Sequence, residues 1–277
     1  MDQKITSDPA AIAAEILDAT ATHRSIAPFS SRPGGLSAAD AAQVAVRLRD
    51  ALVARGERLT GRKIGFTNRT IWPEYNIYAP NWGWVTDRTT RDLAPGLTLR
   101  AADFVEPKLE PEIMFGLARA PAPDMDERAL IGCVDWIALG YEVVQSIYPG
   151  WKFAPADTKA CNAMHGALLV GPRHTIAPRG DASSEKWIAE LAAFTAELAC
   201  NGTVMDRGAG ANVLDSPLLA LRHLVQLLAD DPLNPPLAAG EVVSTGTVTR
   251  ALPVKAGETW TASVRGLPLA PVTVTFA

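Results

Sequence analysis

A pair of glutamates separated by one residue marks the segment that most constrains the fold, residues 105–117 (VEPKLEPEIMFGL). Glu110 and Glu112 precede the apolar run IMF, which is typical of a buried β-strand. Side chains alternate between the two faces of a strand, so both carboxylates should project from the same face. Pro111 lies between them and cannot donate a ladder hydrogen bond. We therefore expect this strand to lie at a sheet edge or to contain a bulge.

The two carboxylates suggest a cation, because like charges on one face repel unless a proton or a cation lies between them. Mg²⁺ and Mn²⁺ prefer carboxylate oxygens, although a solvated face is the commoner explanation of an isolated ExE sequence. Glu142 strengthens the metal hypothesis, because it interrupts the apolar run IALGYEVV and a buried carboxylate needs a partner. Alternatively, Glu142 could lie at a strand end and contact water or an arginine. Together, Glu110, Glu112 and Glu142 could supply three oxygen ligands.

Other polar side chains could act beside such a site. Lys63, in the predicted strand RKIGF, could hold a substrate carboxylate or transfer a proton, or could extend to solvent. His165 precedes a predicted strand, where a structural histidine bonded to the backbone is the commoner case. Thr245, Thr247 and Thr249 alternate in STGTVTR and should share one strand face, although strand propensity alone could explain them.

Helical signals are concentrated near the N-terminus. Asp8 and Ser37 are suited to cap two helices that fill most of this part of the chain. A later helix should begin after Ser216, where proline occupies the first helical position. We therefore expect a helical N-terminal portion at residues 1–60 and a β-rich catalytic domain at residues 61–277.

Strand signals dominate the second part of the chain. Asn201–Gly202 is the strongest hairpin signal, residues 79–83 predict a turn, and residues 67–75 predict a short helix broken at Trp72–Pro73. Helices followed by many irregular strands indicate an α+β protein with a mixed, rolled, barrel-like sheet. The predicted strands are residues 62–66, 84–86, 97–100, 110–117, 137–144, 167–170, 192–198, 203–206, 242–248, 259–264 and 271–276.

Composition and motifs argue against several classes of function. The formal charge is −4 and no basic stripe appears, which argues against nucleic acid as a partner. No apolar run approaches the roughly 20 residues that cross a bilayer, and the N-terminus lacks the apolar core of a signal peptide. Three cysteines without CxxC spacing suit a reducing cytoplasm. We therefore expect a cytoplasmic protein. Neither GxGxxG nor a P-loop motif is present, which argues against a Rossmann or P-loop nucleotide-binding protein.

Several segments occur in the order seen in bacterial 2-keto-4-pentenoate hydratases: GRKIGFTNR, PNWGWV, KLEPEIMF, ALGYEVV, NAMHGALLVG and EVVSTGTVTRALPVKAGETWTA. The chain resembles this family from about Arg47 to its C-terminus. These hydratases belong with the 4-oxalocrotonate decarboxylases in the fumarylacetoacetate hydrolase superfamily, so the resemblance implies a β-rich roll. The combined KIGFT and ExE signatures are far more specific than either signature alone.

The resemblance implies that Glu110, Glu112 and Glu142 bind Mg²⁺ or Mn²⁺. The carboxylate and 2-oxo oxygens of a small 2-oxo acid would chelate the ion, and the ion would stabilise an enolate. Lys63 would move a proton while the enzyme, a hydro-lyase of aromatic catabolism, adds water to a 2-hydroxy-2,4-dienoate. The predicted substrate-binding residues are Thr67, Asn162 and Thr247, and the predicted catalytic residues are Lys63, Asn81 and His165.

Asn81 is the main departure from the family pattern. In the better-known hydratases the turn reads roughly EPDFG, and its aspartate is taken as the partner of the lysine. Asparagine cannot take or give a proton as a carboxylate does. His165 or Asp87 could serve as the acid or base instead, or the reaction could differ.

Three alternatives to hydration stay open. One is decarboxylation of a 4-oxalocrotonate-type diacid. Another is hydrolytic C–C cleavage, but the resemblance to that branch of the superfamily implies a His/Glu pair near the N-terminal side of the site, and we find no convincing pair in this sequence. The third is a non-catalytic partner subunit, against which the intact glutamates and Lys63 argue. The resemblance also implies a homo-oligomer that could associate with a related hydratase or decarboxylase.

Overall fold

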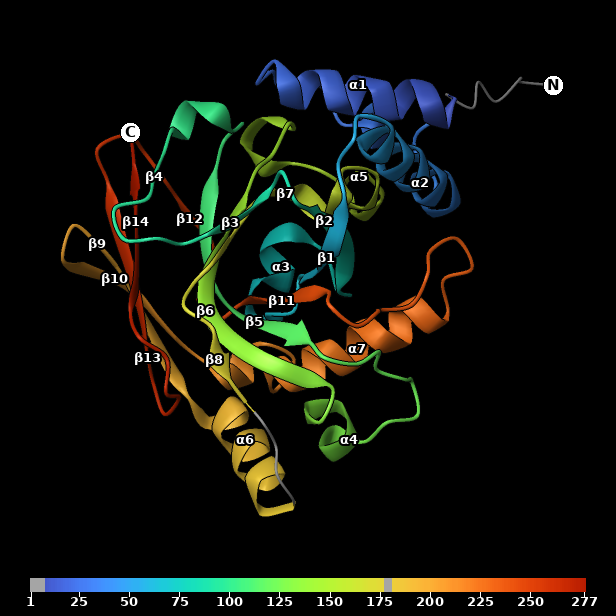
Figure 1. The fold of residues 1–277 in the computed structure, drawn as a ribbon. Coiled ribbons are helices and arrows are strands. Elements are labelled where there is room, and N and C mark those ends of the chain that lie inside the picture. Colours follow the sequence, from blue (N-terminus) through green and yellow to red (C-terminus); the bar gives the residue numbers. More distant parts are fainter. Residues whose placement is uncertain (1–7, 177–180) are drawn as a thin grey trace.

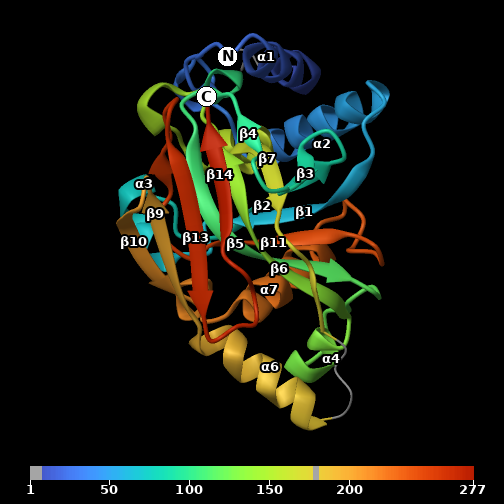
Figure 2. The ribbon, with the colours of Figure 1, turned by 60° about the vertical axis from the view of Figure 1, so that its left-hand side comes forward.

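The computed structural model describes residues 8–176 and 181–277 (Figure 1). Two sheets pack against each other, with helices α1 and α2 at one end of the molecule and α4 and α6 at the other (Figures 1 and 2). This arrangement confirms the prediction of an α+β fold with a mixed, curled sheet. Within the described residues, no helix is long and apolar enough to cross a membrane.

The larger sheet supplies the strands around the glutamates. Its main order is β2-β1-β11-β5-β6-β7-β3, and β12 and β8 pair with β5 and β6. Most neighbours are antiparallel, whereas β1–β11 and β3–β7 are parallel. The strands are β1 (Leu59–Gly65), β2 (Asn81–Thr86), β3 (Thr90–Asp92), β5 (Lys108–Leu117), β6 (Val134–Val144), β7 (His165–Val170), β8 (His174–Thr175), β11 (Val242–Thr247) and β12 (Leu252–Pro253).

The smaller sheet encloses the main core. Its order is β10-β9-β13-β14-β4, and Tyr141 of the larger sheet donates a 2.9 Å hydrogen bond to the carbonyl of Val272. The predicted hairpin is confirmed, because Asn201 (φ 49°) and Gly202 (φ 81°) both adopt the left-handed conformation that such turns require. The strands are β4 (Thr98–Leu99), β9 (Thr195–Cys200), β10 (Thr203–Ala209), β13 (Thr259–Arg265) and β14 (Val272–Phe276).

Helix caps follow the predicted residues. Asp8, Ser37 and Ser216 each accept a backbone N–H hydrogen bond at about 3 Å at the start of α1, α2 and α7. The α-helices are α1 (Pro9–Ala21), α2 (Ala38–Ala54), α3 (Trp72–Tyr75), α4 (Glu127–Ile131), α5 (Pro155–Ala160), α6 (Asp181–Ala193) and α7 (Pro217–Ala229). Short 3₁₀ turns are Phe29–Ser31, Arg69–Ile71, Ala101–Asp103, Pro149–Trp151, Asn162–Met164 and Gly210–Asn212.

Helices α1 and α2 share a second core cluster with residues between β6 and β7. Ile16 and Val44 of these helices belong to the same buried group as Ile147 and Met164. The division at residues 60 and 61 stays a prediction, since apolar packing crosses it at this cluster.

Several local predictions were wrong. The expected strand over residues 192–198 is shortened, because α6 extends to Ala193 and β9 begins only at Thr195. The expected turn at residues 79–83 is partly strand, since Asn81 begins β2. Trp72–Pro73 does not break a helix but begins α3, where proline is tolerated because the first-turn N–H has no intrahelical partner.

Pro111 was predicted to mark an edge strand or a bulge, yet β5 is central, between β11 and β6. The bulge lies in the neighbouring strand, where the register shifts between Ser244 and Thr247. The Pro111 carbonyl accepts a 3.0 Å hydrogen bond from Val248 N, so the side of Pro111 that lacks an N–H faces this interruption. A central proline is therefore tolerated, because the regular ladder is already broken beside it.

Candidate metal centre

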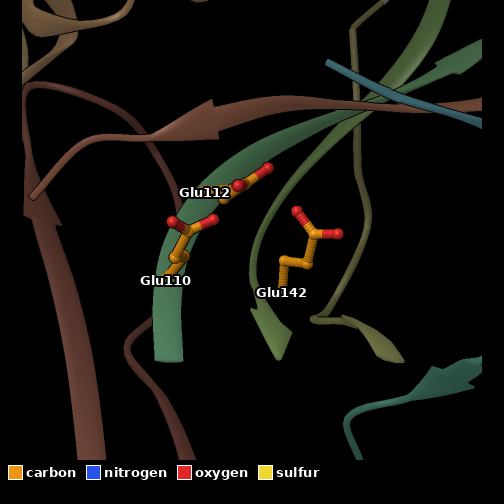
Figure 3. A group of neighbouring side chains, drawn as sticks. All are labelled: Glu110, Glu112 and Glu142. Atoms are coloured by element: carbon orange, nitrogen blue, oxygen red, sulfur yellow. The ribbon is translucent and has the colours of Figure 1, made fainter. Parts of the chain in front are cut away.

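The three glutamates converge on one face of two paired strands. Glu110 and Glu112 lie on β5, and Glu110 is directly opposite Glu142 of β6. One carboxylate oxygen from each residue lies within 4.8 Å of the others (Figure 3). Glu112 and Glu142 are fully buried, so these charges are removed from water. The predicted same-face arrangement is thus present, with the third carboxylate supplied across the ladder.

Strand β11 fixes one oxygen of Glu112. Its Oε2 accepts hydrogen bonds from the Ser244 hydroxyl and, at 2.9 Å, from the backbone N–H of Gly246. Its Oε1 is buried and has no hydrogen-bond partner among the described residues. This oxygen is a buried electron-pair donor that a metal ion can use.

Two basic side chains contact Glu142. Lys63 Nζ lies 3.1 Å from Glu142 Oε2, and His165 Nδ1 lies 2.7 Å from Oε1. On its other side, His165 Nε2 lies 2.9 Å from the hydroxyl of Thr89. Both ring nitrogens are thus engaged, which fixes the orientation of the imidazole against Glu142. The commoner alternative for His165, a structural histidine bonded to the backbone, is not what is seen, because both ring nitrogens contact side chains.

Burial dominates the electrostatics of the site. It raises the pKa of Glu110 to about 7, with the charge of Glu142 adding to the effect. Burial and the two neighbouring carboxylates raise the pKa of Glu112 well above its usual value. Burial acts in the same sense on Glu142, yet the charge of Lys63 and the bond from His165 lower its pKa overall.

The pKa of Lys63 moves in the opposite sense to that expected for a buried amine. Burial alone would lower it, but the charges of the three glutamates together outweigh burial and raise it. One lysine cannot neutralise three carboxylates, so a divalent cation completes the charge balance. The oxygen-only donor set fits Mg²⁺ or Mn²⁺.

A cavity opens beside the glutamates and is lined by Lys63, Glu110, Thr67 and Thr247. Thr67 Oγ1 is buried and has no hydrogen-bond partner within residues 8–176 and 181–277. Gly246 leaves it room, because a Cβ at that position would lie 1.8 Å from Oγ1. The predicted substrate-binding residues Thr67 and Thr247 are therefore beside the centre, and Thr67 has an unused hydroxyl.

Asn81 lies next to Lys63. Its Nδ2 donates to Thr158 Oγ1 at 2.9 Å, and Thr158 uses its own proton on the carbonyl of Pro155. Oδ1 of Asn81 is buried and finds no hydrogen-bond partner in the described part of the chain. A Cβ on Gly65 would lie 3.0 Å from both this oxygen and Lys63 Nζ, so the two atoms face the same small space.

Asn162 and Asp87 are placed elsewhere. The Asn162 amide bonds through both its atoms to the main chain of Trp84, at 2.7 and 2.9 Å, and does not line the cavity beside Lys63. Asp87 pairs with Arg58, and these contacts lower its pKa. Asp87 thus does not replace the missing aspartate. Its carboxylate serves the loop before β1.

The threonines of STGTVTR do not share a regular strand face, contrary to expectation. Gly246 is left-handed (φ 98°), and β11 ends at Thr247. The hydroxyls of Thr245, Thr247 and Thr249 all donate to backbone carbonyls. The glycine turns the chain so that its N–H reaches Glu112, which alternation alone could not reveal.

The cavity has an apolar end that sequence reasoning missed. Its walls there come from segments far apart in the sequence, and Pro149–Trp151 contains the left-handed residues Gly150 and Trp151, for which no local pattern gave a signal. Ser244, Thr89 and Gly246 were likewise missed as supports, since only tertiary contact brings them to the glutamates. The apolar lining residues are Phe66, Ile71, Tyr75, Val144, Trp151 and Met164.

Comparison with characterised proteins agrees with this geometry. A 2-hydroxyhexa-2,4-dienoate hydratase of Comamonas testosteroni is 28% identical over 91% of this chain and 92% of its own. A 2-keto-4-pentenoate hydratase of Burkholderia vietnamiensis is 31% identical over 93% of this chain and 94% of its own. The solved 4-oxalocrotonate decarboxylase of Pseudomonas putida G7, complexed with magnesium and adipate, superposes with a TM-score of 0.86 at 26% identity, over 97% of both chains.

The same decarboxylase has also been solved with calcium and acetate, and superposes with a TM-score of 0.83. Divalent cations thus accompany this fold in two solved structures, in keeping with the three-glutamate centre described above. The family description "Fumarylacetoacetate (FAA) hydrolase C-terminal" matches residues 79–275, most of the chain. The chain therefore belongs to the fumarylacetoacetate hydrolase family.

Proposed function

We propose that the protein is a metal-dependent hydratase that adds water to a 2-hydroxy-2,4-dienoate. The observation that carries this proposal is the three-glutamate centre with Lys63 Nζ 3.1 Å from Glu142 on the wall of a partly apolar cavity. The similarity to hydratases over more than nine-tenths of the chain supports the same reaction. The 2-hydroxydienoates are intermediates of the aromatic catabolism that the sequence resemblance implied.

Glu110, Glu112 and Glu142 would hold the cation. When bound, Mg²⁺ or Mn²⁺ supplies Lewis-acid stabilisation of the negative charge that develops on the oxygens of a 2-oxo acid. Lys63 is held as an ammonium ion by the surrounding carboxylates, so it can donate a proton or a hydrogen bond to the substrate. The free hydroxyl of Thr67 can bond to a substrate oxygen, which would fix the acid in the cavity.

The reaction needs two proton movements. The enol hydroxyl of 2-hydroxypenta-2,4-dienoate gives up its proton and C5 gains one, which forms a conjugated 2-oxo acid. Water then adds its oxygen to C4, and C3 gains the remaining proton to give 4-hydroxy-2-oxopentanoate. Lys63 is placed to transfer protons, and the unpartnered Oδ1 of Asn81 can orient Lys63 or the attacking water. His165 would act through Glu142, as a positioning residue.

Decarboxylation of a 4-oxalocrotonate-type diacid is the second candidate. The close superposition on a 4-oxalocrotonate decarboxylase favours it, and the same stabilised negative charge would develop when CO₂ leaves. The two reactions differ in what the far end of the substrate must contact.

Product analysis by NMR tests the proposal. With Mg²⁺ and freshly generated 2-hydroxypenta-2,4-dienoate, we expect 4-hydroxy-2-oxopentanoate to appear, and a chelated sample should not form it. Turnover of the 4-oxalocrotonate substrate with CO₂ release, and none of the dienoate, would replace hydratase by decarboxylase. Failure of both substrates while Mg²⁺ still binds would favour a partner-subunit role.

We also infer that the enzyme is a cytoplasmic homo-oligomer that can associate with a related decarboxylase or hydratase. The family resemblance supports this inference, and all three cysteines are free, as in a reducing compartment. Light scattering after size-exclusion chromatography should give a mass that is a multiple of the 29.4 kDa chain.

A further inference from the structure

We propose that this site selects acids with an uncharged, apolar tail, so that its substrate carries one carboxylate rather than two. The inference rests on the proposed function, because it assumes that the 2-oxo acid end lies at the three glutamates. It goes further by assigning the opposite end of the cavity a role in choosing the substrate.

The position of the tail follows from the ladder between β5 and β6. Glu110 pairs with Glu142, and Lys108 pairs with Val144 two residues farther along. Two strand residues span about 7 Å, which is the scale of a short acid extending from the centre. Val144 lines the cavity at this second step, together with the rings of Tyr75 and Trp151. A substrate tail that extends in this direction would contact apolar side-chain atoms.

Both rings direct their polar atoms away from this wall to other partners. The Tyr75 hydroxyl accepts a 2.7 Å hydrogen bond from Lys108 Nζ. Trp151 Nε1 donates a 3.0 Å bond to the carbonyl of Glu106. The two rings pack edge to face at 6.4 Å, so their positions are mutually fixed. The indole N–H of Trp151 is therefore used, and the Tyr75 hydroxyl, which already accepts from Lys108, adds no positive charge for a second carboxylate.

The nearby cation faces the two rings and not the cavity. Lys108 does not line the cavity, and its Nζ lies 4.2 Å from the ring centre of Trp151 and 5.2 Å from that of Tyr75. Among the described residues that line the cavity, Lys63 is the single cation, and Glu142 already contacts it. A terminal carboxylate would thus lose its water without gaining a counter-ion, which is strongly unfavourable.

Two six-carbon acids provide a matched test. 2-Oxohexanoate and 2-oxoadipate share the 2-oxo acid end and the carbon count, and differ in a terminal methyl or carboxylate. Titration calorimetry of the Mg²⁺-loaded protein should show 2-oxohexanoate binding at least about tenfold more tightly. Equal affinities, or tighter binding of 2-oxoadipate, would overturn the selection of an apolar tail while leaving the metal-dependent handling of 2-oxo acids intact.

Two further arms separate the possible failures. If neither acid binds in an Mg²⁺-dependent way, the proposed function fails together with this inference. In Lys108→Met we expect the ratio of the two affinities to stay within about twofold of wild type, because Lys108 faces the rings rather than the ligand. A selective loss of 2-oxoadipate binding in this variant would show that Lys108 receives a second carboxylate, contrary to the proposal.

Discussion

The two ends of the cavity are built in opposite ways. At the charged end, each buried glutamate and Lys63 has a named partner, and Glu112 keeps one oxygen free. At the apolar end, Tyr75 and Trp151 present carbon and use their polar atoms elsewhere. The charged end sets the class of reaction, because it fixes where negative charge can develop. The apolar end sets which acid can use that chemistry.

The two ends also bear on how enzymes of this fold differ from one another. The solved decarboxylase binds magnesium and adipate, a diacid, on the same fold. If the charged end is common to such enzymes, differences between them must come from the opposite end and from residues behind the glutamates, such as Asn81 and His165. Changes at each position should therefore affect different measurements.

Removing a ligand should have the largest effect. In Glu112→Ala the cation loses Oε1 of a carboxylate that Ser244 and Gly246 hold in place through Oε2. Mutation of a residue that only supports a metal ligand typically lowers metal affinity or activity about 10- to 100-fold. Loss of the ligand itself should cost more, so we expect Mg²⁺-dependent turnover to fall more than about a hundredfold. The fold should remain, as judged by circular dichroism. Glu197→Ala, a change at a partly exposed glutamate paired with Arg207, is the matched control. Unchanged turnover in Glu112→Ala would remove Glu112 from the centre.

The next effect concerns the support behind Glu142. In His165→Ala, Glu142 loses the 2.7 Å bond that orients its Oε1. We expect Mn²⁺ affinity, measured by electron paramagnetic resonance, to fall about 10- to 100-fold. Thr89→Val should cause a smaller loss, since it acts through the imidazole. His174→Ala is the control, because that ring packs on Trp187 and not on the site. A raised KM with unchanged metal affinity would instead make His165 a substrate-binding residue.

Lowering the pH should weaken metal binding at the charged end of the cavity and leave the apolar end unchanged. The pKa of Glu110 is raised to about 7 by burial and the charge of Glu142. At pH 6 such a group is only about one-tenth ionised, so Mn²⁺ should bind about tenfold more weakly than at pH 8. Because the folded pKa exceeds the unfolded value, the metal-free protein should lose stability as pH rises from about 4.5 to 7. A pH-independent metal affinity would contradict the raised pKa.

The charged end could be predicted from the sequence more fully than the apolar end, for a physical reason. Glu110 and Glu112 sit on one face by strand periodicity, and Glu142 stands out as a carboxylate in an apolar run. Both signals are local. The bond from His165 to Glu142, by contrast, depends on how β7 pairs with β6, which no local pattern encodes.

The apolar end is assembled from three separate stretches of chain, so its residues share no pattern. Tyr75 is the last residue of the short helix α3, and Trp151 adopts φ 59°, a conformation that its own sequence does not indicate. Pro111 shows the converse problem. Its intrinsic preference indicates an edge, but the bulge in β11 permits a central position. Tertiary pairing overrode propensity there.

The smallest effect should come from restoring the family carboxylate beside Lys63. Asn81→Asp places a charged oxygen where Oδ1 now lies unpartnered, in the small space shared with Lys63 Nζ. A carboxylate can exchange a proton that the amide cannot, so we expect kcat for 2-hydroxypenta-2,4-dienoate to rise by about threefold or more. Its hydrogen bond to Thr158 would be lost, because a carboxylate cannot donate to a hydroxyl that already uses its proton on Pro155. Thr158→Val in the wild-type background separates that loss from the gained charge. A fall in kcat for Asn81→Asp, with Thr158→Val unchanged, would show that the charged end of this enzyme works with the amide rather than despite it.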